Sequence, residues 1–123
     1  MIDTDSKLLI AGGSSGMGLA LARLSLDLGA QVVLVGRDEA KLARAGTMLG
    51  GRGRLELLTA DITCEDAVAK LFETVGDLDH IVCTAADIRG AYELLPALDL
   101  QAARQAMESK VFGPMLLAKH GAP

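Results

Sequence analysis

Residues suited to anion binding gather near the amino terminus, in segment 7–18, which reads KLLIAGGSSGMG. An apolar run ends at Ala11, and a stretch rich in glycine and serine follows it. Such a stretch has no regular periodicity and tolerates unusual backbone angles, so it predicts a turn. Apolar residues at helical spacing resume at Leu19, so we expect a helix to begin between Gly16 and Gly18. A helix N-terminus presents unpaired N–H groups and the positive end of the helix dipole. The turn therefore predicts a cradle for a pyrophosphate.

The spacing of the glycines makes this prediction more specific. Gly12, Gly16 and Gly18 follow the pattern Gly-x-x-x-Gly-x-Gly, and the segments VVLVGRD and IVCTAA come later in the chain. Together these segments resemble the short-chain dehydrogenase/reductase family. The resemblance implies that Gly12 makes the turn, that Gly16 lets the cofactor approach and that Gly18 allows close packing of the helix on the strand. It also assigns to the cofactor the residues between these glycines, Ser14, Ser15 and Met17. A glycine-rich turn that binds nothing is the alternative.

The end of the second apolar run bears on the choice between NAD and NADP. A carboxylate there would bond the adenosine ribose hydroxyls of NAD, whereas a cation accommodates the extra phosphate of NADP. The chain has Gly36 where the family's NAD enzymes carry the acid, and Arg37 follows directly. Arg37 can make a charge-assisted fork to a phosphate, so we expect NADP(H). NAD is the less favoured alternative because Asp38 and Glu39 come next, and Arg37 as a solvated loop charge is another.

Two further segments contribute candidate cofactor contacts through the resemblance. In the family, the carboxylate at the position of Asp61 holds the adenine amino group, and the backbone of Ile62 lies alongside. The alternative role of Asp61 is local, as a cap for a helix that starts at Thr63. The segment IVCTAA aligns with the family's Asn-Asn-Ala-Gly stretch, which steadies the central sheet and lines the ribose. Thr84 and Ala85 fall in that stretch, and Thr84 keeps a hydroxyl that could form a hydrogen bond.

The segment ESKVFG at 108–113 resembles the part of the family in which many members carry a catalytic Asn three residues before a glycine. Lys110 occupies that position in this chain. Pro114 lacks an N–H and clashes with the carbonyl four residues earlier, which predicts a kink at Lys110. In the family, a bend at this point exposes a backbone carbonyl to a water relay. A surface lysine on an amphipathic helix is the alternative interpretation of Lys110.

The chain does not carry the rest of the family's catalytic pattern, a Ser followed by Tyr-x-x-x-Lys. Its only tyrosine is Tyr92, and the residue four positions later is Pro96. The resemblance covers nearly all of the chain but only about half of the family's fold. We therefore expect no catalytic residue here, and an isolated chain that is inactive. A non-catalytic dinucleotide-binding protein or an inactive fragment is the alternative to the nucleotide-binding portion of an oxidoreductase.

Strands and helices alternate along the chain in a way that could position these residues. Apolar runs predict strands at 8–10, 31–35, 55–59 and 80–84. Helical spacing and capping signals predict helices that begin near Gly16, Asp38, Thr63 and Asp99, the second ending at Gly50–Gly51 and the last reaching about His120. This alternation predicts an α/β fold, a truncated Rossmann-type doubly wound parallel sheet with four strands in the order 3-2-1-4. We expect a single NADP-binding domain over residues 1–123.

Composition limits the other functions that the chain could have. A net charge of −4, a single Tyr and no Trp argue against a nucleic-acid surface. No apolar run approaches the roughly 20 residues of a membrane span, and no signal-peptide pattern opens the chain, so we expect a cytoplasmic protein. Cys64 and Cys83 lack metal-ligand spacing, so we expect buried, reduced thiols and no metal.

The resemblance also suggests partners. It implies a small-molecule carbonyl or alcohol substrate in a full-length form. The predicted fourth strand would be left as an open edge of the sheet, and an open edge can pair with another chain. We therefore expect self-association.

Overall fold

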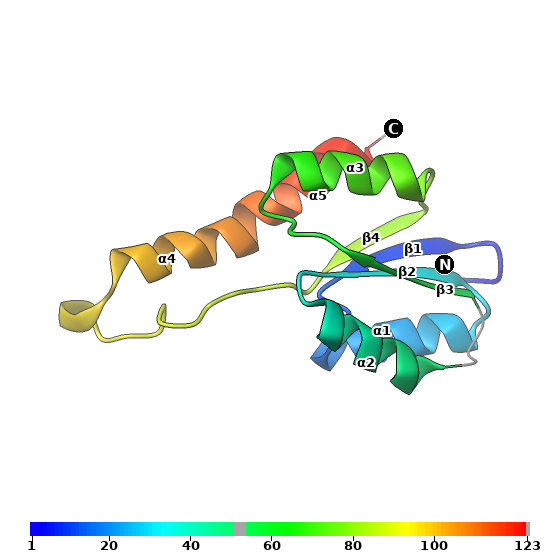
Figure 1. The fold of residues 1–123 in the computed structure, drawn as a ribbon, viewed down its shortest axis with the longest axis horizontal. Coiled ribbons are helices and arrows are strands. Elements are labelled where there is room, and N and C mark those ends of the chain that lie inside the picture. Colours follow the sequence, from blue (N-terminus) through cyan, green and yellow to red (C-terminus); the bar gives the residue numbers. More distant parts are fainter. Residues whose placement is uncertain (51–53, 123) are drawn as a thin grey trace.

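One parallel β-sheet forms the centre of the molecule. The computed structural model describes residues 1–50 and 54–122. The strands are β1 (Lys7–Ala11), β2 (Gln31–Gly36), β3 (Arg54–Thr59) and β4 (His80–Cys83), all parallel and in the order β3-β2-β1-β4 (Figure 1). This confirms the predicted strand order, and each strand end lies within one residue or two of its predicted position.

Helices cover both faces of the sheet. Helices α1 (Gly16–Asp27) and α2 (Glu39–Leu49) lie on one face, and α3 (Glu65–Val75) and α5 (Gly113–Gly121) lie on the other (Figure 1). Leu8 and Ile10 of β1 belong to the core on one face, whereas Leu9 and Ala11 belong to the core on the opposite face. Because both faces are covered, β1 is continuously apolar rather than alternating.

The helices on the first face bury a narrower stripe than their apolar content indicates. In α1 the buried residues are Gly18, Ala22, Ser25 and Leu26, whereas Leu24 is exposed. Leu28 and, in α2, Met48 are also exposed. These three apolar residues are exposed because only the side of each helix that contacts the sheet is covered. Gly50 caps α2 as predicted, and Gly51 lies outside the described residues.

Helix α3 begins two residues later than predicted. The expected start at Thr63 is wrong: Cys64 is the N-cap residue and its side chain makes no capping bond. Thr63 is instead held by Asp61 in the preceding turn. Glu65, the first residue of α3, forms an ion pair with Lys119 of α5 and contacts His120 Nε2 at 3.0 Å.

The last predicted helix is divided into two parts. Asp99 is its N-cap residue as predicted, and its side chain accepts a hydrogen bond from the Gln101 N–H at 2.8 Å. Helix α4 (Leu100–Met107) is followed by a π-helical turn, Glu108–Phe112, and then by α5. The turn has Lys110 at its centre, where Pro114 predicted an irregularity.

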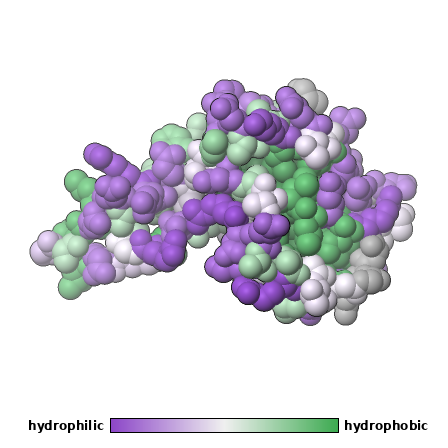
Figure 2. Space-filling model, viewed as in Figure 1, coloured by the Kyte–Doolittle hydropathy of each residue, from purple (hydrophilic) through white to green (hydrophobic). Residues whose placement is uncertain are grey.

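Helix α4 and the segment before it form an arm beside the layered part of the molecule (Figure 1). The arm contains a short 3₁₀ turn, Leu95–Ala97, and exposes Tyr92, Leu94, Leu95 and Leu100. In Figure 2, apolar surface is visible at the tip of the arm and in the band that the sheet occupies. No helix in the described part of the chain is long and apolar enough to span a bilayer.

The two cysteines have different environments. Both are free thiols, as predicted, but Cys64 is exposed and Cys83 is only partly buried. The prediction that both are buried is thus wrong for Cys64, which precedes α3 at the surface. Burial raises the pKa of the Cys83 thiol, which favours its neutral form.

Candidate dinucleotide site at the carboxyl ends of the strands

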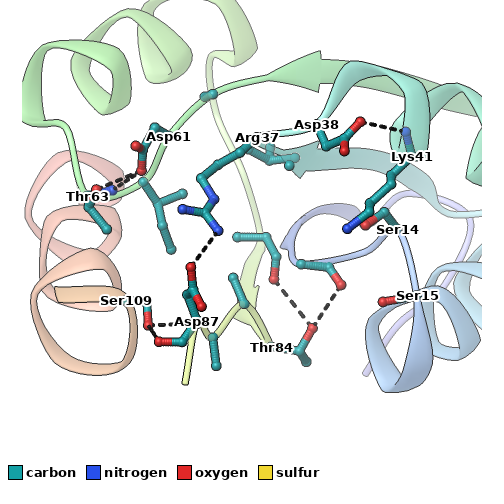
Figure 3. A pocket seen from close by; sticks show the side chains of 18 residues that line it. Ser14, Ser15, Arg37, Asp38, Lys41, Asp61, Thr63, Thr84, Asp87 and Ser109 are labelled. Atoms are coloured by element: carbon teal, nitrogen blue, oxygen red, sulfur yellow. Dashed lines mark hydrogen bonds and ion pairs between the residues drawn. The ribbon is translucent and has the colours of Figure 1, made fainter. Parts of the chain in front are cut away.

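A pocket of about 240 Å³ lies where the carboxyl ends of β1, β2 and β4 meet (Figure 3). In open parallel sheets, this crevice is where ligands bind. Eight of the eleven predicted cofactor-binding residues line it: Gly12, Ser14, Ser15, Arg37, Asp61, Ile62, Thr84 and Ala85. The other three, Gly16, Met17 and Gly18, belong to the first turn of α1 and do not line it.

The glycine turn is packed against the end of β4. Gly12 has φ +89°, and a Cβ placed on it would lie 2.4 Å from the backbone nitrogen of Ala85. A Cβ on Gly18 would lie 2.5 Å from the Gly12 carbonyl oxygen and 2.6 Å from Thr84 Oγ1. Neither position can therefore carry a side chain without moving the backbone around it. Gly12 makes the turn, and Gly18 brings α1 close to it.

The N-terminus of α1 is left open. Ser15 precedes the helix in an extended conformation, and its side chain makes no capping hydrogen bond. Gly16 has φ +55°, and no heavy atom of the described residues lies within 4 Å of the position that its Cβ would take. Helix N–H groups without a capping side chain and space beside them are what a phosphate requires. The turn therefore fits a pyrophosphate.

Arg37 enters the pocket from the end of β2, and Asp38, which follows it, also lines the pocket. Asp38 is the N-cap residue of α2, and its carboxylate accepts a hydrogen bond from the Lys41 N–H at 3.0 Å. This bond lowers the pKa of Asp38 below its ordinary value. The side chain of Lys41 also lines the pocket, so the β2 end contributes two cations.

Asp61 and Thr84 hold the pocket walls in place. Asp61 Oδ1 accepts hydrogen bonds from the Thr63 N–H at 2.9 Å and the Thr63 hydroxyl at 2.7 Å, so the local role of Asp61 is present. Its contact with adenine stays a prediction. The hydroxyl of Thr84 donates to the carbonyl oxygens of Gly12 and Ala11, at 3.2 and 3.4 Å. Thr84 thus joins β4 to the glycine turn.

Asp87 and Ser109 are among the pocket residues that the sequence did not predict. The carboxylate of Asp87 contacts Arg37 at 3.3 Å and Arg89 at 2.8 Å. The hydrogen bonds from Arg89 and then Arg37 hold the pKa of the Asp87 carboxyl well below its ordinary range. Ser109, buried in the π-helical turn, accepts a hydrogen bond from the Asp87 N–H at 2.8 Å. The sequence offered one signal for them, because Pro114 predicted an irregular turn beside Ser109.

Lys110 does not reach this pocket. It is exposed at the centre of the π-helical turn, which agrees with a surface position for its side chain. The turn closes through a hydrogen bond from the Gly113 N–H to the Glu108 carbonyl. Pro114 has no N–H for the Lys110 carbonyl, so an α-helical bond cannot form there. The backbone at Lys110, rather than its side chain, is the irregular feature.

Comparison with known proteins agrees with this geometry. The family model described as short chain dehydrogenase matches residues 6–123. The chain is 33% identical over 121 residues to 1-deoxy-11-beta-hydroxypentalenate dehydrogenase of Streptomyces arenae, which covers 94% of this chain and 43% of that protein.

Solved structures agree as well. A short-chain type dehydrogenase/reductase from Mycobacterium ulcerans is 32% identical, with a TM-score of 0.86 over 99% of this chain and 47% of that one. A Pseudomonas aeruginosa protein, RhlG, solved as an active-site complex with NADP, shares the fold at 24% identity and a TM-score of 0.81, over 96% of this chain and 45% of that one. The chain thus spans less than half the length of these relatives. It belongs to the short-chain dehydrogenase/reductase family, whose members are oxidoreductases that bind nicotinamide dinucleotides.

Proposed function

We propose that this chain is the NADP(H)-binding part of an oxidoreductase that transfers hydride between NADP(H) and a small carbonyl or alcohol substrate. The family, the position of the pocket and the open N-terminus of α1 support dinucleotide binding. In the proposed complex, residues 12–18 hold the pyrophosphate, Asp61 and Ile62 hold the adenine, and Thr84 and Ala85 line the ribose.

The observation that carries the choice of NADP(H) is the end of β2. Gly36 is the last residue of the strand and offers no carboxylate, while the guanidinium of Arg37 and the side chain of Lys41 line the pocket. Asp38 and Glu39 are the acids that kept NAD open as an alternative. Asp38 caps α2 and also lines the pocket, and Glu39 is the first residue of that helix. A phosphate beside Arg37 would gain charge-assisted hydrogen bonds, whereas the ribose hydroxyls of NAD(H) would find no acceptor at Gly36.

The proposed reaction requires further groups beyond the dinucleotide site. The dinucleotide supplies the hydride, and the substrate oxygen needs a proton donor. Tyr92, the only tyrosine in the sequence, lies in the arm with 77% of its surface exposed, and it does not line the pocket. The proposal is therefore that this chain alone binds the dinucleotide without turnover. That state corresponds to the alternative of a non-catalytic dinucleotide-binding protein.

Replacing Arg37 tests the proposed function. Arg37→Ala should weaken NADPH binding about 10- to 100-fold, because a hydrogen bond to a charged group is worth about 1.5–3 kcal/mol, and should change NADH binding less than about twofold. Isothermal titration calorimetry with both nucleotides measures this. Arg23→Ala, at an exposed position in α1, is the control for the loss of one positive charge. Equal losses for the two nucleotides would remove the NADP assignment, and no binding of either would remove the function.

We also propose a cytoplasmic location. The two cysteines are free thiols, and one of them is exposed, which suits a reducing compartment. Subcellular fractionation checks this, and recovery of the protein in an oxidising compartment would contradict it.

A further inference from the structure

An ion pair crosses the pocket above the end of β1. Arg37 follows β2 and Asp87 comes after β4, and β1 lies between these two strands in the sheet. Figure 3 shows the guanidinium of Arg37 extended toward Asp87, with Asp61 and Thr63 to one side of it and Ser14 and Thr84 to the other. Arg37 Nη2 and Asp87 Oδ2 are 3.3 Å apart. The side chain proposed to recognise a phosphate thus already has an anionic partner.

Asp87 is the fixed member of this pair. Its backbone N–H donates to Ser109 Oγ at 2.8 Å, and its carboxylate accepts from Arg89 Nε and Nη2 at 2.9 and 2.8 Å. Its side chain is 19% exposed, against 56% for Arg37. The contact with Arg37 is longer than either contact with Arg89. Arg37 can therefore leave Asp87 while Arg89 and Ser109 keep the carboxylate in place.

A carboxylate and a phosphomonoester compete for the same guanidinium groups. Each presents a pair of anionic oxygens that accept forked hydrogen bonds from arginine. A guanidinium turned to make a forked bond to a phosphate can no longer point Nη2 at Asp87, so the two anions compete for the orientation of Arg37. A carboxylate left a few ångströms away also repels a phosphate that carries close to two negative charges. The hydrogen bonds from Arg89 and Arg37 lower the pKa of the Asp87 carboxyl, so this group is ionised at neutral pH.

We propose that Asp87 is a specificity-determining residue, which competes with the phosphate of a phosphorylated dinucleotide for Arg37 and so reduces the discrimination between NADP(H) and NAD(H). This inference rests on the proposed function, because it requires that the phosphate binds at Arg37. Arg89 has the opposite effect in this arrangement. It neutralises the Asp87 carboxylate and so weakens its hold on Arg37.

The decisive variant is Asp87→Asn, which keeps the side-chain shape and the backbone bonds to Ser109 but removes the charge. It should tighten NADPH binding about three- to tenfold and leave NADH binding within about twofold, since an exposed ion pair is worth up to about a factor of five and the repulsion is also removed. The same variant should tighten 2′-AMP but not adenosine. Calorimetry at low salt measures all four ligands, and the gain with NADPH should shrink at 0.5 M salt.

Two further variants separate this effect from a change in net charge or in folding. Asp77→Asn alters the net charge equally at an exposed residue outside the pocket, and it should leave the NADPH affinity unchanged. Arg89→Ala leaves the Asp87 carboxylate without its stronger partner, so it should weaken NADPH binding about two- to fivefold with little effect on NADH. Thermal melts of each variant identify any that does not fold.

The outcomes distinguish the inference from the proposed function. If the unmodified chain prefers NADPH through Arg37 and Asp87→Asn leaves that preference unchanged or lowers it, the inference fails alone. Equal tightening of NADPH and NADH also overturns it, because the pair would then only obstruct the pocket. If Arg37→Ala does not alter the preference, the proposed function fails first.

Discussion

At the scale of single residues, two separate features of position 12 require a glycine. Its φ of +89° lies in the left-handed region, which disfavours side chains, and the place of its Cβ is taken by the backbone of Ala85. Gly76, which ends α3, has the first requirement without the second. Its φ is +70°, and no heavy atom of the described residues lies within 4 Å of the place of its Cβ. The two glycines therefore separate conformational strain from steric overlap.

Gly12→Ala should lower the free energy of unfolding by about 2–5 kcal/mol, since the left-handed conformation costs about 1–2 kcal/mol and overpacking about 1–3 kcal/mol more. Gly76→Ala is the matched control and should cost only the first of these amounts. Urea denaturation followed by circular dichroism gives both values. Equal losses in the two variants would show that the glycine turn can move away from β4 at little cost.

The sequence predicted the residues of the pocket that belong to regular elements or to their immediate ends. Gly12 and Arg37 follow apolar strands directly, so their places at one edge of a parallel sheet could be deduced. Asp87 and Ser109 could not be deduced in this way. Asp87 lies in a segment without periodicity, its partner Arg37 is 50 residues away in sequence, and Ser109 faces the pocket only because the helix around it is irregular.

At the scale of elements, the π-helical turn links the arm to the pocket. Ser109 is buried there, and its Oγ lies 2.8 Å from the Asp87 nitrogen and 3.1 Å from the Ala106 carbonyl oxygen. The serine thus joins α4 to the segment that follows β4. Ser25 in α1 is also buried, but its hydroxyl has no hydrogen-bond partner among the described residues.

Ser109→Ala should lower the free energy of unfolding by about 1–2 kcal/mol, because it leaves the Asp87 N–H without its acceptor. Ser25→Ala is the control and should be neutral or stabilising, because no bond is lost and an unsatisfied hydroxyl is removed. Chemical denaturation measures both. An equal effect of the two substitutions would show that the Ser109 bond does not contribute to stability.

Element boundaries were predicted where a single residue type determines them. Asp99 caps α4 through its carboxylate, which acts locally, and Gly50 ends α2. The start of α3 was misplaced because Thr63 has two possible partners, its own helix or Asp61, and the sequence does not rank them. The last helix was predicted with a kink at Lys110, and the structure has a π-helical turn around that residue, a form that the position of Pro114 alone does not specify.

At the scale of the whole molecule, short connections between alternating strands and helices predict parallel pairing with crossovers. They do not determine the order of the strands. The order β3-β2-β1-β4 was predicted as the first half of a doubly wound sheet, and the structure confirms it. The arm was not predicted, because nothing in its local pattern shows whether α4 packs on the sheet or extends away from it. Because the arm extends away from the sheet, its apolar side chains are exposed, among them Leu94, Leu95 and Leu100.

The expectation of self-association concerns the same scale and stays a prediction. In the described sheet β4 pairs only with β1, and a groove lined by Ile81, Cys83, Leu117 and Gly121 runs beside its free edge. An unpaired strand edge beside apolar side chains can join a second chain. Sedimentation velocity should therefore show species larger than a monomer that increase with concentration. A monomer that unfolds in one cooperative transition would contradict the prediction.

The position of β1 has a consequence for hydrogen exchange. Its residues Leu8, Leu9 and Ile10 are fully buried. The strand is paired on both edges and covered on both faces. Its amide protons can reach solvent only when the whole sheet opens, whereas those of the arm can exchange through local opening. Exchange should therefore divide the chain into a slow part centred on β1 and a fast part at the arm. A dinucleotide that binds at the turn after β1, as proposed, would slow exchange in the first part by a factor that rises with the ratio of free ligand to its dissociation constant.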